Sequence, residues 1–150
     1  MLNDSLYDSC LAKQQSVIAL FSGCSSVQMK YEKLIELGRG LPPYPAALKT
    51  SDRLVKGCQS EMYLDVSFSE GRLHFQAYSE ALISAGLAAL LLAVYDDEPP
   101  EAVLSCPPRF LDELGVHGSL SPSRSNGLSS LFLRMKQEAL NFLIVAKKAD

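Results

Sequence analysis

The chain has 150 residues, of which 47% are hydrophobic and 21% are charged, and its net charge is −3 at pH 7. This length and composition are typical of one globular domain that buries a core without disulfides or structural metals, so we expect a single domain over residues 1–150. The acidic balance and the absence of a basic stripe argue against binding to nucleic acid or to anionic lipid.

The first part of the chain is predicted to be helical. Apolar residues follow a loose helical pattern over residues 6–21. Ser25, with Gln28 three residues later, resembles a capping box that would open a second helix ending near Leu37. Residues 41–51 hold three prolines, which remove backbone donors and predict an irregular connection.

After Cys58 the hydrophobic period changes from helical to alternating. Apolar and polar residues alternate over residues 62–68 and again over residues 73–77, with Glu70-Gly71 between them as a turn. This pattern predicts a β-hairpin with one buried face.

The rest of the chain is predicted to return to helices. Ser79 is suited to cap a helix over the apolar residues 81–95, which are too few to span a membrane. Further helices are expected around residues 101–104, around residues 108–114, and from Ser121-Pro122 to about Lys147. Strands clustered between helices indicate an α+β fold, with a small antiparallel sheet of two or three strands packed against helices.

The cysteines and the N-terminal residues indicate a reducing location. Residues 1–14 lack the basic and apolar regions of a signal peptide, because Asp4 and Asp8 interrupt them. The chain is neither small nor rich in cysteine, which disfavours a disulfide framework. We therefore expect a cytoplasmic protein whose four cysteines are reduced thiols: Cys10, Cys24, Cys58 and Cys106.

Cys58 is the strongest candidate for a reactive residue. It precedes the first predicted strand, on a loop where functional residues concentrate. Its neighbours are basic, small or polar, which favours a thiolate: Arg53, Lys56, Gly57, Gln59 and Ser60. A lone cysteine is also common as a small core residue, so the local sequence alone leaves that alternative open.

Other catalytic and metal chemistries find little support in the sequence. No two cysteines have C-x-x-C spacing, and His74 and His117 are distant from every cysteine in sequence, so no metal site is predicted. A Cys–His hydrolase would need one of these histidines beside Cys58. His74 is more simply interpreted as a solvent-facing residue of the second strand. Arg124, near the start of the last predicted helix, could meet an anion or a thiolate.

Four motifs in order resemble one known family. Gly57-Cys58-Gln59-Ser60 before a strand resembles the active-site motif of SufE-type sulfur-acceptor proteins, which include the CsdE relatives. Three further segments are similar to this family, within a resemblance that spans about residues 27–140: Tyr31–Gly38 with the following Leu41-Pro42, Ser79–Asp96, and Leu120–Leu128 with its Ser-Pro-Ser-Arg sequence.

The resemblance implies a function in sulfur transfer. In this family, a SufS/CsdA-like cysteine desulfurase that uses pyridoxal phosphate hands persulfide sulfur to the loop cysteine, and the acceptor stimulates the desulfurase. The sulfur then passes to a SufBCD-like scaffold complex for iron–sulfur cluster assembly. Cys58 would be the acceptor, with Arg124, Gly57, Gln59 and Ser60 in supporting roles and no cofactor or metal of the chain's own.

The resemblance also implies an accessory sulfurtransferase-type protein rather than a free-standing enzyme. The alternatives are a free-standing cysteine-dependent thiol enzyme and a non-catalytic adaptor domain. The chain departs from the family at Tyr63, where many members have tryptophan, and at Ala77-Tyr78-Ser79, where they have a Gly-Asp-Ser turn. We further hypothesise that Cys58 is sheltered in the free protein and moves outward on docking.

Overall fold

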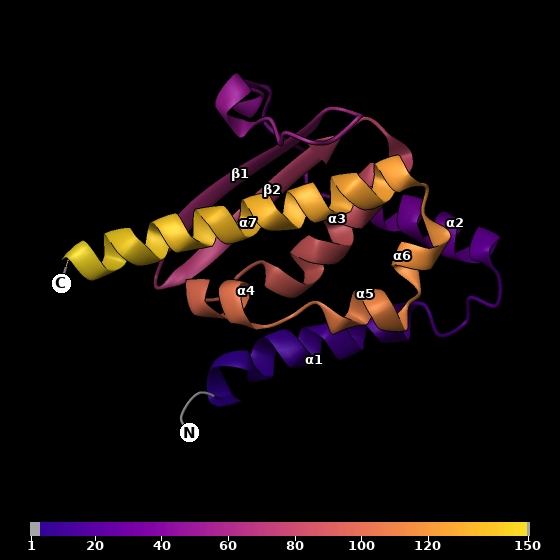
Figure 1. The fold of residues 1–150 in the computed structure, drawn as a ribbon, viewed down its shortest axis with the longest axis horizontal. Coiled ribbons are helices and arrows are strands. Elements are labelled where there is room, and N and C mark those ends of the chain that lie inside the picture. Colours follow the sequence, from indigo (N-terminus) through magenta and orange to yellow (C-terminus); the bar gives the residue numbers. More distant parts are fainter. Residues whose placement is uncertain (1–3, 150) are drawn as a thin grey trace.

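The computed structural model describes residues 4–149, and it describes side-chain surroundings for residues 7–145 apart from His117 and Ser119. Within this range the chain forms seven α-helices, two short 3-10 helices and one two-stranded antiparallel sheet (Figure 1). The elements are α1 (Asp4–Leu20), α2 (Val27–Arg39), η1 (Ala46–Leu48), η2 (Ser51–Arg53), β1 (Met62–Ser69), β2 (Arg72–Ser79), α3 (Leu82–Tyr95), α4 (Pro100–Ser105), α5 (Arg109–Glu113), α6 (Val116–Ser119) and α7 (Pro122–Ala149). The predicted α+β class is confirmed.

The hairpin has the register that its alternating sequence predicts. Leu64 lies opposite Ala77, and Val66 lies opposite Phe75, so their side chains share one face of the sheet. Buried residues on both strands alternate with more exposed ones, as expected for a sheet with one face on the core.

Helix α3 is the centre of the core. Eleven of its 14 residues are buried, which confirms the interpretation of this apolar segment as a core helix. It packs against α2 at a close crossing, where a Cβ on Gly86 would overlap the backbone carbonyl of Leu34. Within residues 4–149, no helix is both long and apolar enough to cross a membrane.

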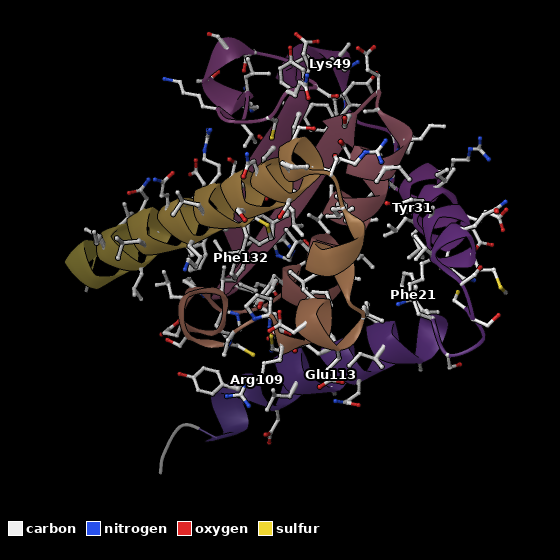
Figure 2. The ribbon with its side chains drawn as sticks, turned by 45° about the vertical axis from the view of Figure 1, so that its right-hand side comes forward. Phe21, Tyr31, Lys49, Arg109, Glu113 and Phe132 are labelled. Atoms are coloured by element: carbon white, nitrogen blue, oxygen red, sulfur yellow. The ribbon has the colours of Figure 1, made fainter. Side chains whose placement is uncertain are left out.

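The other helices enclose α3 and the hairpin. In Figure 1, α7 runs along the hairpin, and α4 and α5 lie between α7 and α1. The rings of Tyr95 in α3 and Phe132 in α7, the latter labelled in Figure 2, have centroids 5.1 Å apart. This contact fixes α7 on the same core that supports the hairpin.

Three local expectations differ from the structure. Ser26 rather than Ser25 caps α2, because its hydroxyl accepts the Met29 N–H at 3.2 Å. Ser79 is the last residue of β2 and not the cap of α3, which begins at Leu82 after Ala81; the Ser79 hydroxyl accepts the Ala81 N–H instead. Helix α6 was not expected, and it follows Gly115, whose φ of 67° is favourable for glycine.

Candidate functional site

Cys58 lies on the connection between η2 and β1, against the first turns of α7. Its Sγ is 3.7 Å from the carbonyl oxygen of Gly127, and the side chain is half-buried. Gly57 has a φ of 93°, and a Cβ at that position would overlap the Ser130 hydroxyl. Only glycine combines this backbone conformation with so close an approach to α7, which explains why Gly57 precedes the thiol.

Cys58 lines a pocket of about 600 Å³. The loop and the start of β1 form one side, and residues of α2, α3 and α7 form the others. The pocket is lined by both apolar and polar residues: Ile35, Cys58, Gln59, Ser60, Met62, Ala81, Leu82, Ile83, Ser84, Leu87, Ser121, Ser123, Arg124, Gly127, Leu128 and Leu131. The structure therefore brings together Cys58, Gln59, Ser60 and Arg124 around one pocket. Gly57 is not among the lining residues and lies instead against Ser130 of α7.

Arg124 lies on the rim of the pocket and contacts α2. The carbon of its guanidinium group is 6.0 Å from the centroid of the Tyr31 ring, within the range of a cation–π contact. Tyr31 is labelled in Figure 2, on α2. The Arg124 backbone N–H is 3.4 Å from the Ser121 hydroxyl at the start of α7. Arg124 thus lines the same pocket as Cys58, and its guanidinium group contacts Tyr31 of α2.

The surroundings of the thiol do not activate it in this conformation. Burial raises the pKa of Cys58 above its ordinary value. The positive charge expected from Arg53 is directed elsewhere, because its Nε lies 2.7 Å from a carboxylate oxygen of Asp65 on β1. At neutral pH the sheltered Cys58 is therefore a protonated thiol.

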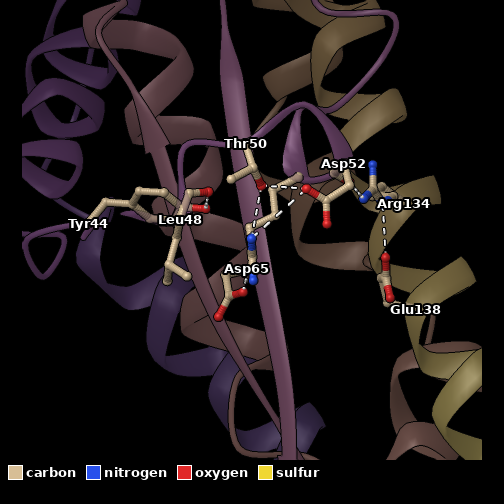
Figure 3. Close-up of polar contacts among 8 residues, drawn as sticks. Tyr44, Leu48, Thr50, Asp52, Asp65, Arg134 and Glu138 are labelled. Atoms are coloured by element: carbon tan, nitrogen blue, oxygen red, sulfur yellow. Dashed lines mark hydrogen bonds and ion pairs between the residues drawn. The ribbon is translucent and has the colours of Figure 1, made fainter. Parts of the chain in front are cut away.

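The segment before Cys58 is held by a polar network between β1 and α7 (Figure 3). Besides its ion pair with Asp65, Arg53 donates to the Thr50 hydroxyl at 2.9 Å. Arg134 in α7 donates to the carbonyl of Leu54 at 3.3 Å and to the carbonyl of Asp52. The sequence reasoning did not identify Arg134, since nothing in the local pattern links it to a loop 80 residues away.

His74 does not form a catalytic pair with Cys58 in the described structure. His74 lies opposite Ser67, five residue pairs from the Met62–Ser79 end of the hairpin, or about 17 Å along the strand. The side chain of His117 is outside the described residues. Among those residues, no three His, Cys, Asp or Glu side chains are grouped as a metal site would require.

The other three cysteines lie apart from this pocket. All four are free thiols, with Cys10 and Cys106 buried and Cys24 half-buried. The amide nitrogen of Gln14 is 3.4 Å from the sulfur of Cys106 and 4.0 Å from that of Cys10. Burial is the main cause that raises the pKa of Cys10. These two thiols belong to the core.

The candidate site is thus a half-buried thiol on a loop, beside a pocket in an α+β domain. The model of the SufE family, described as an Fe-S metabolism associated domain, matches residues 15–139. The chain therefore belongs to the SufE family, which associates it with iron–sulfur metabolism.

Curated relatives agree with this assignment. The chain is 35% identical over 130 residues to the SufE-like protein 1, chloroplastic/mitochondrial, of Arabidopsis thaliana. That match covers 86% of this chain and 35% of the relative, so the chain spans about a third of the length of that protein. An uncharacterized SufE-like protein of Synechocystis is 29% identical over 126 residues, which cover 84% of this chain and 79% of the relative.

The fold matches the solution structure of a hypothetical protein from Thermus thermophilus. The TM-score is 0.73 at 25% identity, over 88% of this chain and 96% of the other. The match supports the α+β architecture. The cytoplasmic location stays a prediction.

Proposed function

We propose that this protein accepts persulfide sulfur from a cysteine desulfurase on Cys58 and delivers it for iron–sulfur cluster assembly. Membership of the SufE family supports a role in iron–sulfur metabolism. The observation that carries the residue assignment is that Cys58 lines the pocket, whereas Cys10, Cys24 and Cys106 do not.

The transfer is an exchange between two sulfur centres and involves no net oxidation or reduction. The Cys58 thiolate attacks the terminal sulfur of a cysteine persulfide on the desulfurase. A new S–S bond forms on Cys58 while the S–S bond of the donor breaks, and its electron pair remains on the donor cysteine as a thiolate. The proton that Cys58 loses is then available to that thiolate.

This chemistry fits a pocket with one thiol and, among the described residues that line it, no histidine or carboxylate side chain. The incoming persulfide is already activated, so the acceptor needs a thiolate and access rather than a catalytic triad. In this proposal the chain binds no cofactor of its own, and a SufS/CsdA-like partner supplies pyridoxal phosphate. A SufBCD-like scaffold complex is the proposed recipient.

The position of Cys58 supports the idea that docking exposes it. In the free protein the thiol faces Gly127 and its pKa is raised by burial, which keeps it protonated. Moving the loop into solvent or onto a partner would remove the desolvation and return the pKa toward its ordinary value. Stimulation of the desulfurase would follow from removal of its persulfide.

Mass spectrometry after incubation with a cysteine desulfurase and cysteine tests this proposal. We expect one added sulfur atom on Cys58 in the wild-type protein and complete loss of that adduct in Cys58→Ser. Cys24→Ser is the matched control, because Cys24 is also half-buried but lies outside the pocket, and it should keep the adduct on Cys58. If the wild-type chain binds the desulfurase without gaining sulfur, the protein is an adaptor.

A further inference from the structure

The Cys58 loop contacts α7 along a single stripe of that helix. Gly127, Ser130 and Arg134 are spaced by three and four residues, so they lie on one face of α7. Gly127 meets the Cys58 sulfur, Ser130 meets Gly57, and Arg134 bonds to backbone carbonyls of the preceding residues. We call these three residues the loop seat.

The loop has two parts that are held with different strength. Its base, residues 52–55, is fixed on β1 by the Val55 N–H, which donates to the Met62 carbonyl at 2.8 Å, and by the Arg53–Asp65 ion pair. Its tip, residues 56–61, crosses from the base to β1. Among the described residues, the one hydrogen bond from the tip is the 3.7 Å contact of the Cys58 thiol with Gly127.

Arg134, the third residue of the loop seat, joins the base of the loop to α7. Its two terminal nitrogens donate to the carbonyls of Leu54 and Asp52. Its Nε lies 3.0 Å from a carboxylate oxygen of Glu138, and Figure 3 shows Arg134 between Asp52 and Glu138. Glu138 is one helical turn further along α7, so this ion pair orients the guanidinium group toward the loop. A planar guanidinium with donors in several directions can make all three contacts, and an ammonium group cannot.

We infer that Arg134 is a positioning residue for Cys58, which sets how closely the loop rests on α7 and therefore how often the thiol is exposed. This inference rests on the proposed function of Cys58 as the sulfur acceptor. Because Arg134 holds the base, the weakly held tip can leave the seat while residues 52–55 stay in place. Without Arg134 the base loses its bonds to α7, and the tip loses the alignment that keeps the Cys58 sulfur against Gly127.

The test is the rate at which Cys58 is alkylated by iodoacetamide in the folded protein, measured by peptide mass spectrometry relative to Cys24 in the same molecule. We expect Arg134→Ala to raise this Cys58/Cys24 ratio about tenfold, which corresponds to about 1.4 kcal/mol in the opening equilibrium. Arg134→Lys should give an intermediate ratio. The protein should still fold, because the contacts of the base with β1 remain.

Arg72→Ala is the matched control. Arg72 also donates to a backbone carbonyl, that of Asp97 at 2.8 Å, but it lies at the opposite end of the hairpin from Cys58. Its removal should leave the ratio unchanged. An equal rise in Arg72→Ala and Arg134→Ala would mean a general loss of stability and would overturn the inference, as would an unchanged ratio in folded Arg134→Ala.

Gly127→Ala is a second variant of the loop seat, and it should lower the Cys58/Cys24 alkylation ratio rather than raise it. A Cβ at this position would lie 3.7 Å from the Cys58 sulfur, in ordinary van der Waals contact, and would meet no other atom within 4 Å. We expect the alkylation ratio to fall about twofold, since the sulfur gains an apolar contact in the closed state. A rise in this variant would contradict the assignment of the seat.

Persulfide acceptance distinguishes this inference from the proposed function. If Arg134→Ala raises the alkylation ratio but Cys58 never gains sulfur from a desulfurase, the positioning role of Arg134 is correct and the carrier function is wrong. If Cys58 gains sulfur but Arg134→Ala leaves the alkylation ratio unchanged, the carrier function is correct and the positioning role of Arg134 is wrong.

Discussion

Cys58 and the pair formed by Cys10 and Cys106 are thiols of one chain in two different regions. Cys10 and Cys106 are buried where α1 meets the segment between α4 and α5, and the Gln14 amide nitrogen lies within 4.0 Å of both sulfurs. Cys58 is half-buried between a loop and α7. Burial raises the pKa of both Cys10 and Cys58, so the direction of the pKa shift does not separate a core thiol from a candidate acceptor.

The difference between the two regions is the segment that carries each sulfur. Cys10 is part of a helix, and it can reach solvent only if α1 leaves the core. Cys58 is part of a six-residue tip with one weak hydrogen bond to the rest of the molecule, among the residues described. Access to a thiol in this protein therefore depends on the free energy of a local opening rather than on its static exposure.

The variant with the largest expected effect is Gln14→Ala, which lowers stability in the region of Cys10 and Cys106. The Gln14 amide nitrogen donates to the Pro107 carbonyl at 2.9 Å, and its amide oxygen accepts the Phe110 N–H at 3.2 Å. Gln14→Ala leaves the Phe110 N–H buried without this partner and removes a donor from the part-buried Pro107 carbonyl, so we expect a loss of about 3 kcal/mol in the free energy of unfolding. Urea unfolding measures this loss.

The same Gln14→Ala variant should leave Cys58 alkylation unchanged under native conditions, because the Cys58 loop makes no contact with Gln14. If alkylation of Cys58 rises in proportion to the lost stability, the thiol is reached by global unfolding, and the proposed distinction between the two regions fails.

Gly57→Ala is expected to have a smaller effect on stability and a clear effect on access. The positive φ at this position costs a residue with a side chain about 1–2 kcal/mol, and the added Cβ would overlap the Ser130 hydroxyl. We expect the loop to be displaced from α7, with faster alkylation of Cys58 and a slightly lower melting temperature. Gly71→Ala is the control, since Gly71 also has a positive φ but a Cβ there would meet nothing within 4 Å.

The smallest expected effect is a shift in the pH dependence of Cys58 alkylation. Because burial raises the pKa of the folded thiol, the thiolate appears at higher pH in the folded protein than in the unfolded chain. The midpoint of rate against pH should therefore lie above that of the urea-unfolded protein, and Arg134→Ala should move it back down. A midpoint in the folded protein at or below that of the unfolded chain would contradict the sheltered thiol.

The same pKa shift has a consequence for stability with a definite sign. Between the unfolded and folded pKa values the unfolded chain loses a proton that the folded chain keeps, so stability falls as pH rises through this interval. Below the pKa of the unfolded thiol, about 8.5, Cys58 is protonated in both states, and the contribution of this pKa shift to folding stability is fully present.

Local sequence patterns were sufficient to predict the α+β class and the hairpin, whereas the assignment of Cys58 as the sulfur acceptor stays a prediction. Alternation over residues 62–68 and 73–77 is a local consequence of a sheet with one buried face, and the structure confirms it. The Gly-Cys-Gln-Ser motif and the segment around Arg124 are local as well, and they led to the family that the comparisons confirm. The cap of α2 was misplaced by one residue, because Ser25 and Ser26 are adjacent and either hydroxyl can accept a free N–H at the helix start. The cap of α3 was misplaced by two residues, because Ser79 stays in β2 and the helix begins after Ala81, which makes no side-chain cap.

The surroundings of the thiol, in contrast, depend on the tertiary structure. The contact of Cys58 with Gly127 and the bonds of Arg134 to the loop join residues 69 to 82 positions apart, and the pocket combines residues from Ile35 to Leu131. No local pattern encodes such pairings, because they depend on how α7 packs against the hairpin through α3. For the same reason Arg53, basic and near Cys58 in sequence, pairs instead with Asp65 and does not offset the effect of burial on the thiol.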